Sequence, residues 1–124
     1  MAVNIDEGEP GTFKDRWILE NNPHQLIESM LLAGYALGVR NAFVYMRGEF
    51  DLPYRRLQAA IEEAYAAGYL GKPLHGTGFV MDLVIIQGAG SYVCGEETAL
   101  LESLEGKRGI VRAKPPLPAI SGLF

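Results

Sequence analysis

The residues with the clearest capacity for chemistry lie in the stretch GAGSYVCGEETALL, Gly88 to Leu101. Its three glycines could let the backbone approach a ligand closely, because glycine has no side chain to keep a partner away. The adjacent carboxylates of Glu96 and Glu97 would repel a phosphate placed beside them. Both features also have structural explanations: a tight turn from a strand into a helix, and acidic side chains at the positive end of a helix dipole.

The spacing of these glycines matches neither of the common phosphate-binding loops. Gly88 and Gly90 fit the first half of G-x-G-x-x-G, but the next glycine, Gly95, comes two positions late, and no P-loop pattern is present. Cys94 has no cysteine or histidine partner in its own segment, so we expect a small buried residue rather than a nucleophile. The two histidines lie in other segments without the spacing of metal ligands. We therefore predict no catalytic nucleophile and no metal site.

Strands and helices are predicted to alternate along the chain. Asn22-Pro23 is typical of a helix start with Asn22 as its cap, and Gly38 is typical of a helix end. The run from Leu83 to Ile86 is apolar on both faces, as in a buried parallel strand. The predicted elements are a strand stub at 2–3, a loop at 4–16, helices at 22–37, 51–67 (capped by Asp51) and 96–104, strands at 41–47 and 79–87, and an irregular tail at 107–124.

This order predicts an α/β domain with a parallel sheet and right-handed crossovers. Ligands of such sheets sit beyond the carboxyl ends of the strands. Three segments should meet there: Asn4 to Gly11, Arg47 to Asp51, and Gly88 to Glu97. The short first strand and the irregular tail indicate a domain that is incomplete at both ends, so we expect a piece of a larger protein.

Composition narrows the class of protein. The chain has 124 residues, of which 48% are hydrophobic, and a net charge of −4, as expected for one globular domain rather than a disordered tail. The acidic balance argues against nucleic-acid binding. No apolar run is long enough to span a bilayer, and the acidic first residues do not resemble a signal peptide. The single cysteine excludes an internal disulfide and an iron–sulfur cluster built from this chain alone. We expect a cytoplasmic protein.

Several segments together resemble one known family. Residues 4–16, NIDEGEPGTFKDR, resemble the N-x-D-E-x-E-P-G-[TS]-[FY]-K-D-R segment of the FMN- and NADH-binding flavoprotein of NADH–quinone oxidoreductase, respiratory complex I. Residues 88–100 resemble its G-A-G-x-Y-[IV]-C-G-E-E-T-A-L segment, and residues 104–108 and 114–116 resemble its L-E-G-x-R and K-P-P runs. The resemblance covers nearly the entire chain. Diaphorase subunits of NAD-linked hydrogenases and formate dehydrogenases share the same block and remain an alternative.

The resemblance implies a Rossmann-like three-layer fold, with residues 1–124 forming part of an FMN- and NADH-binding domain. In this family the glycine loop approaches the uncharged isoalloxazine ring, so carboxylates are tolerated because the phosphate lies elsewhere. Hydride would pass from NADH to FMN by stacking and orientation, and electrons would continue to iron–sulfur clusters. The flavin would be bound by Asn4, Asp6, Glu7, Gly95, Glu96 and Glu97, and NADH would meet Glu9, Tyr92, Glu97 and Lys114.

The departures from the family pattern shape the remaining expectations. Leu117 stands where the family has an aromatic residue near the adenine, and Gly8 where many members have serine. The resemblance places a glycine-rich loop before residue 1, and an FMN phosphate site and a 4Fe-4S cluster motif after residue 124. It also implies partner subunits, especially a thioredoxin-like 2Fe-2S protein, and a peripheral position on the inner face of the cell membrane or on the matrix side of a mitochondrion. The alternative of another class is a non-catalytic α/β fragment without a tightly bound cofactor.

Overall fold

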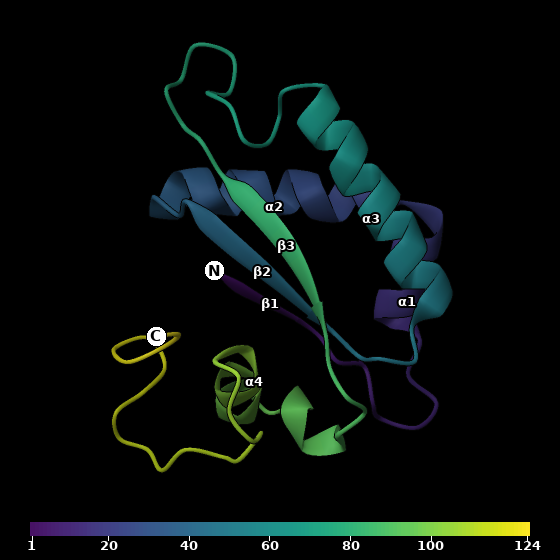
Figure 1. The fold of residues 1–124 in the computed structure, drawn as a ribbon, viewed down its shortest axis with the longest axis vertical. Coiled ribbons are helices and arrows are strands. Elements are labelled where there is room, and N and C mark those ends of the chain that lie inside the picture. Colours follow the sequence, from purple (N-terminus) through teal and green to yellow (C-terminus); the bar gives the residue numbers. More distant parts are fainter.

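A parallel sheet of three strands organises the chain, and the computed structural model describes all of residues 1–124. The strands pair in the order β1-β2-β3, with Ile5 beside Met46 and Tyr45 beside Ile86. Their carboxyl ends therefore meet at one edge of the sheet, toward the lower right of Figure 1. The elements are β1 (Ala2–Ile5), α1 (Lys14–Asn21), α2 (Pro23–Leu37), β2 (Asn41–Met46), α3 (Asp51–Ala66), β3 (Asp82–Gln87), the short 3-10 helix η1 (Tyr92–Gly95) and α4 (Glu97–Leu104).

Side chains of the strands alternate between two layers, as the pleat of a strand requires. One set, including Val44 and Met46, joins the main core beneath α1, α2 and α3. The other set, including Tyr45, packs on Leu100 and Leu101 of α4. Figure 1 shows α4 and the C-terminal tail on the opposite side of the strands from α1 and α3. The α/β class with a parallel sheet is confirmed, and the two cores give it three layers.

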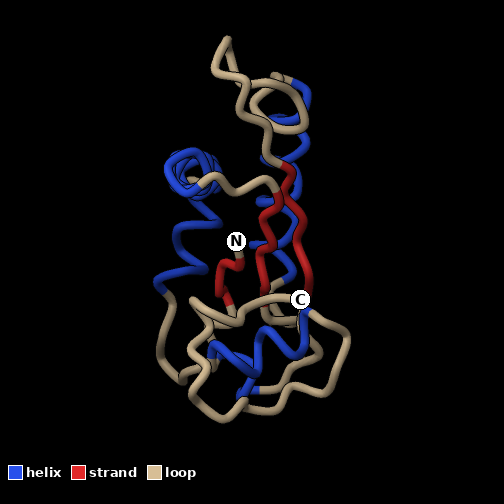
Figure 2. Tube along the Cα trace, turned by 90° about the vertical axis from the view of Figure 1, so that its left-hand side faces the viewer, coloured by secondary structure: helices blue, strands red, loops and turns tan.

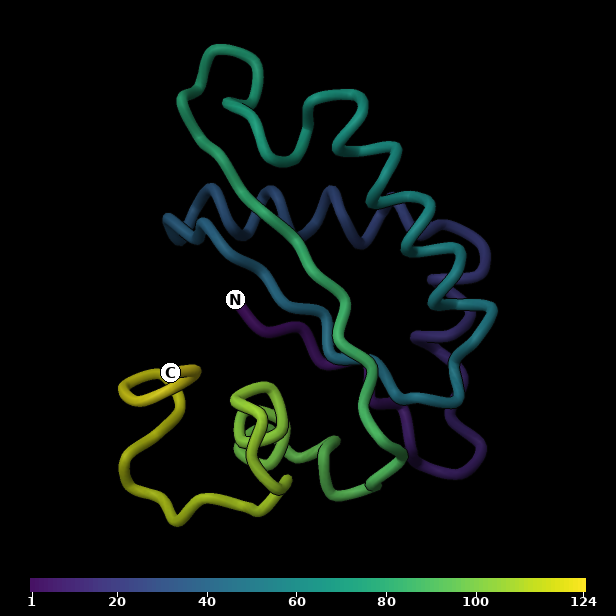
Figure 3. Tube along the Cα trace, in the orientation of Figure 1, coloured from purple at the N-terminus to yellow at the C-terminus, as the bar shows by residue number.

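The tail closes a loop back toward the start of the chain. Residues after α4 form no further helix or strand, as predicted. The trace in Figure 3 carries them past α4 and then toward the N-terminus. Seen from the side in Figure 2, α4 and the loops around it lie below the strands, whereas the loop between α3 and β3 rises above them. The beginning and the end of the chain therefore both contribute to the same region.

Helix α1 was not predicted, and the expected loop at 4–16 is wrong in its last residues. Its first turn has no local side-chain cap. Instead the buried carboxylate of Glu7 accepts hydrogen bonds from the backbone N–H groups of Asp15, at 2.7 Å, and Arg16, at 3.4 Å. The cap therefore comes from seven or more residues upstream, outside the window in which capping patterns are recognised.

Several other boundaries and caps also differ from the prediction. The side chain of Asn22 makes no capping bond, although Pro23 does begin α2. Asp51 lies inside the first turn of α3, with Phe50 at the cap position. β1 extends to Ile5, and β3 begins at Asp82 rather than at residue 79. Gly38 does end α2 as predicted, with a left-handed φ of 70° that favours glycine.

None of the helices is long and apolar enough to span a membrane.

Candidate functional site

The carboxyl end of β1 and the loop after β3 come together, as the sequence predicted. The Asn4 side chain donates through Nδ2 to the backbone oxygen of Gly95 at 2.9 Å, joining residues 91 positions apart. Its Oδ1 accepts from the N–H of Asp6 at 3.0 Å, which shapes the turn at the end of β1. A Cβ on Gly95 would lie 3.4 Å from the Asp6 backbone oxygen, so η1 packs closely on this turn. Asn4, Asp6 and Gly95 thus form one continuous surface.

Two glycines of the site serve packing between loops. A Cβ on Gly88 would lie 2.6 Å from the Tyr45 hydroxyl oxygen, and a Cβ on Gly48 would lie 2.5 Å from the Gly88 backbone oxygen. Both distances are too short for a real side chain, so these positions require glycine whether or not a ligand is present. For Gly88, the structural explanation given above is therefore sufficient.

Asp6 carries the one buried side-chain oxygen that has no hydrogen-bond partner, Oδ2. Burial raises the pKa of this carboxyl, while the nearby Arg47 guanidinium opposes the rise. A buried acceptor without a donor is costly and rare in proteins, and where one occurs it often marks a functional site. No group of the chain donates a hydrogen bond to Oδ2 of Asp6.

Glu7 and Glu9 flank Gly8 but have different surroundings. The Glu7 carboxylate is 6% exposed and is used by the N-terminus of α1, so its predicted contact with a flavin stays a prediction. Glu9 is exposed and accepts a hydrogen bond from the Tyr92 hydroxyl. That bond raises the pKa of Tyr92. Two residues expected to face the same substrate are thus in direct contact.

Arg47 begins the second segment that was predicted to reach this edge, although the sequence assigned it no role, and its side chain supports the turn after β1. Its Nη1 donates to the backbone oxygen of Glu7 at 2.7 Å, and its Nε donates to Glu49 at 3.2 Å. The guanidinium also lies over the Phe50 ring, 5.3 Å from its centroid. A recess of about 60 Å³ separates it from Tyr92 and is lined by Asp6, Gly8, Arg47, Glu49, Gly90, Ser91 and Tyr92.

The adjacent glutamates at the start of α4 have separate tasks. Glu96 is the N-cap: its Oε2 accepts from the N–H groups of Thr98 and Ala99, both at 2.9 Å. A hydrogen bond from the Thr98 hydroxyl is the main reason that the pKa of Glu96 is lowered. Glu97 instead pairs with Lys114 of the tail, and this hydrogen bond raises the pKa of Lys114. The position of Glu96 at the start of α4 is thus explained by capping of the helix, whereas Glu97 pairs with Lys114.

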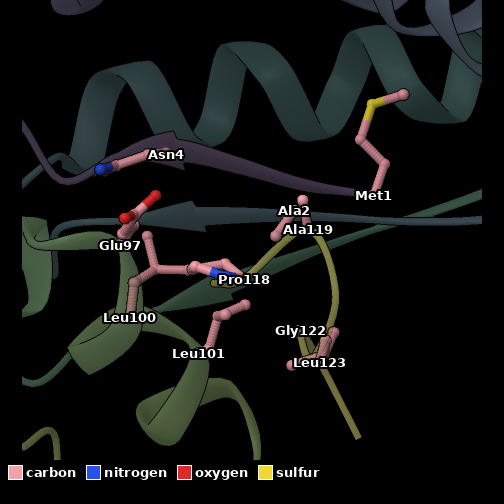
Figure 4. A pocket seen from close by; sticks show the side chains of 10 residues that line it. All are labelled: Met1, Ala2, Asn4, Glu97, Leu100, Leu101, Pro118, Ala119, Gly122 and Leu123. Carbon is pink, nitrogen blue, oxygen red and sulfur yellow. The ribbon is translucent and has the colours of Figure 1, made fainter. Parts of the chain in front are cut away.

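A cavity of about 500 Å³ lies between β1, α4 and the tail. Figure 4 shows Asn4 and Glu97 toward one end and Met1 toward the other. Its volume is within the usual range for small-molecule sites. The lining residues are Met1, Ala2, Asn4, Glu97, Leu100, Leu101, Pro118, Ala119, Gly122 and Leu123. A larger hollow of about 790 Å³ lies between α2 and α3 and contains none of the predicted site residues.

Cys94 and the histidines take no visible part in chemistry. Cys94 is buried with Tyr45 and Leu100, and His24 pairs with Glu63 at 2.9 Å on the outside of the helices. No group of three or more metal-binding side chains is gathered anywhere in the chain. The arrangement offers hydrogen-bond acceptors and a largely apolar cavity, which suit the binding and orientation of a ligand.

Comparison with known proteins places this geometry among flavoproteins. The sequence profile described as the Nuo51 FMN-binding domain matches residues 1–123. An NADH-quinone oxidoreductase subunit of Rhizobium meliloti is 56% identical over the entire chain, which spans 30% of that protein. The mitochondrial NADH dehydrogenase [ubiquinone] flavoprotein 1 of Dictyostelium discoideum is 53% identical, and the chain spans 26% of it.

A solved structure with the same fold comes from a different enzyme. The chain superposes on the crystal structure of an NAD+-reducing [NiFe]-hydrogenase in the H2-reduced state with a TM-score of 0.85 and 45% identity. The match covers 98% of this chain and 20% of the hydrogenase chain. The similarity thus extends to both groups of proteins that the sequence motifs resemble.

Proposed function

The chain belongs to the Nuo51 FMN-binding domain family, and on this premise we propose that it is the part of an NADH dehydrogenase flavoprotein that holds the ring end of FMN and receives NADH. The cofactor contacts would be Asn4, Asp6, Gly95 and Glu96. The substrate contacts would be Glu9, Tyr92, Glu97 and Lys114.

The unpartnered Oδ2 of Asp6 is the observation that carries this proposal. A flavin offers the missing donors, because it carries a ring N–H group and ribityl hydroxyl groups. The Asn4–Gly95 hydrogen bond fixes the wall beside Asp6, so the acceptor is oriented before a ligand arrives. The residues present therefore fit the ring and sugar portions of FMN.

The surroundings of Asp6 carry several carboxylates, which disfavour a phosphate next to them. Glu9 and Glu49 are exposed beside the recess, and Arg47 is already engaged by Glu49 and by the Glu7 carbonyl. The phosphate of the cofactor would therefore be held elsewhere in the complete protein.

When bound, FMN would accept hydride from NADH and pass electrons to iron–sulfur clusters of the complex. The contribution of this chain would be to orient the two rings and to exclude water with the apolar wall of Leu100 and Leu101. Glu9, oriented by the Tyr92 hydroxyl, would accept hydrogen bonds from the ribose of NADH. No side chain here needs to act as a nucleophile.

A diaphorase subunit of an NAD-linked hydrogenase or formate dehydrogenase is the second candidate. The TM-score of 0.85 to the NAD+-reducing hydrogenase favours the hydrogenase form of this alternative. The identities of 56% and 53% to NADH dehydrogenase subunits favour the first candidate. In either case the partners would be other subunits of the complex, including a 2Fe-2S protein, and the location would be peripheral on the inner face of the membrane or in the mitochondrial matrix. The 4Fe-4S cluster would lie in the remainder of the protein.

Anaerobic reduction of the flavin by NADH tests the proposal. In the complete protein that carries this segment, NADH should bleach bound FMN faster than it bleaches free FMN at the same concentration. Asp6→Ala should remove most of this advantage, whereas Asp15→Ala, which alters an exposed pair with Lys14, should preserve it. If the purified protein retains no FMN, or bleaches it no faster than free FMN reacts, the proposal is wrong.

A further inference from the structure

One arginine that no sequence pattern singled out holds the segment after α4. Residues 107–124 form no helix or strand, so backbone ladders do not fix their path. The guanidinium of Arg112 instead donates from Nε to Glu102 at 2.5 Å and from Nη2 to Glu105 at 2.9 Å. Its Nη1 donates to the backbone oxygen of Gly122, also at 2.9 Å. All three guanidinium nitrogens therefore have an acceptor: Glu102 in α4, Glu105 just after it, and Gly122 in the tail.

The backbone of Arg112 adds a fourth contact, to the first turn of α4. Its N–H donates to the Thr98 hydroxyl oxygen at 2.9 Å, and that hydroxyl lies 2.6 Å from Oε2 of Glu96. Glu96 is the cap of α4. Arg112 is thus connected to both ends of the helix that borders the candidate site.

Two parts of the candidate site depend on this connection. Gly122 lines the cavity of about 500 Å³, and a Cβ there would lie 2.9 Å from the Pro118 backbone oxygen, so the tail is tightly folded at this wall. Lys114, two residues after Arg112, reaches Glu97 at the N-terminus of α4. Between Arg112 and Gly122, the side chain that reaches the start of α4 is Lys114, which contacts Glu97 and lies 3.8 Å from Glu96.

We infer that Arg112 is a positioning residue for the dinucleotide substrate: it fixes the tail so that Lys114 stands beside Glu97, where its ammonium offsets the carboxylates that would otherwise repel the phosphates of the substrate. The inference rests on the proposed function. An ammonium binds phosphate as a point charge, so its affinity depends on where the backbone presents it. The planar fork of arginine serves three acceptors at once, and lysine at this position cannot reproduce that geometry.

The test compares Arg112→Gln and Arg112→Lys with a matched control, Lys107→Gln. Lys107 also pairs with Glu105, at 2.7 Å, and lies near Glu102, but it makes no bond to the tail wall. The control therefore removes one positive charge from the same carboxylates without releasing Gly122. Two measurements are made on the 124-residue chain: amide hydrogen exchange over residues 114–124, and calorimetric titration with ADP-ribose, which carries the two phosphates of NADH but cannot reduce a flavin.

Both Arg112 variants should exchange faster over residues 114–124, and Arg112→Gln should bind ADP-ribose roughly tenfold more weakly, the loss expected for about 1.4 kcal/mol. Lys107→Gln should match the wild type in both measurements. If Arg112 contributed only to stability, Arg112→Gln would weaken ADP-ribose binding by the same factor whether or not Lys114 were present. A positioning role instead predicts that Lys114→Gln, which weakens binding in the wild type, has little further effect in Arg112→Gln.

Unchanged exchange in Arg112→Gln overturns the inference, as does full additivity of the two substitutions. If wild-type chain binds neither ADP-ribose nor FMN, the proposed function fails, while the exchange measurement still decides whether Arg112 holds the tail. Should Arg112→Gln fail to fold, Gly122→Ala replaces it, because the added methyl displaces the same wall of the cavity without removing a charge. Unchanged hydrogen exchange and unchanged ADP-ribose affinity in Gly122→Ala would also overturn the inference.

Discussion

At the scale of single residues, Glu9 gives the sharpest prediction about specificity. Its carboxylate is exposed and is oriented by the Tyr92 hydroxyl. A carboxylate in this position can accept hydrogen bonds from the ribose hydroxyls of NADH and repels the additional phosphate of NADPH. Glu9→Gln in the complete protein should keep NADH activity within roughly an order of magnitude and raise the ratio of NADPH to NADH kcat/KM by roughly ten- to a hundredfold.

Tyr92→Phe is the informative companion of Glu9→Gln. It removes the hydroxyl that orients the carboxylate but leaves the negative charge in place, so discrimination against NADPH should largely persist. If Glu9→Gln leaves the relative kcat/KM of the two cofactors unchanged, Glu9 does not face the ribose, and its assignment to the substrate site is wrong.

Cys94 is expected to contribute packing only. It is 4% exposed, and a Cβ on Gly109 would lie 2.5 Å from its sulfur, so the tail presses directly on this side chain. Cys94→Ala should lower the free energy of unfolding by about 1 kcal/mol, measured by urea denaturation, and should leave the spectrum of bound flavin nearly unchanged. Loss of NADH oxidation with the flavin retained would instead assign the thiol a chemical role.

At the scale of elements, the attachment of the tail to α4 should make stability depend on pH. Glu105 accepts hydrogen bonds from Lys107, from the N–H of Phe124 and from Arg112, and these lower its pKa from 4.5 to about 2. A carboxyl whose pKa is lower in the folded state stabilises the fold fully above its unfolded pKa, here 4.5. This contribution is lost as the pH falls from there through about 2.

The midpoint of thermal unfolding should therefore decrease as the pH is lowered from about 5 toward 2, and Glu105→Gln should reduce that dependence. Glu28→Gln is the control, because Glu28 is exposed on α2 and makes no side-chain hydrogen bond. Circular dichroism melts across this pH range measure the effect. Equal pH dependence in Glu105→Gln and in wild type would show that the bonds to Glu105 do not persist in solution.

Element α1 shows where local sequence patterns stop being informative. Gly8, Pro10 and Gly11 indicate a loop, and the residues that follow carry charges on all sides, so no amphipathic stripe marks the helix. What stabilises its start is the buried Glu7 carboxylate, a contact that depends on how the turn folds. In contrast α2 was predictable, because Pro23 and Gly38 mark its two ends locally.

At the scale of the whole molecule, the α/β class and the meeting of β1 with the glycine loop followed from sequence, because parallel strands must present their carboxyl ends together. The Asn4–Gly95 contact confirms that meeting. Partners far apart in the chain were not predictable: Arg47 reaches Glu7 across 40 positions, and Arg112 joins α4 to Gly122. Contacts between residues so far apart leave no regular pattern in the sequence, so they become visible only in the folded structure.

We propose that this chain binds a flavin through its ring and sugar at Asn4, Asp6 and Gly95. Because carboxylates surround Asp6, the phosphate should contribute little to binding by the 124-residue chain. Fluorescence titration with FMN and with riboflavin, which lacks the phosphate, tests this directly in wild type and in Asp6→Ala.

We expect saturable binding of one flavin with a Kd of roughly micromolar or weaker. The Kd values for FMN and riboflavin should agree within about threefold, and Asp6→Ala should bind at least about tenfold more weakly. Nanomolar binding of FMN with much weaker binding of riboflavin would show that the phosphate is held within this chain. Absence of saturable binding of either flavin, or equal binding by Asp6→Ala, would show that Asp6 and its neighbours do not form a flavin site.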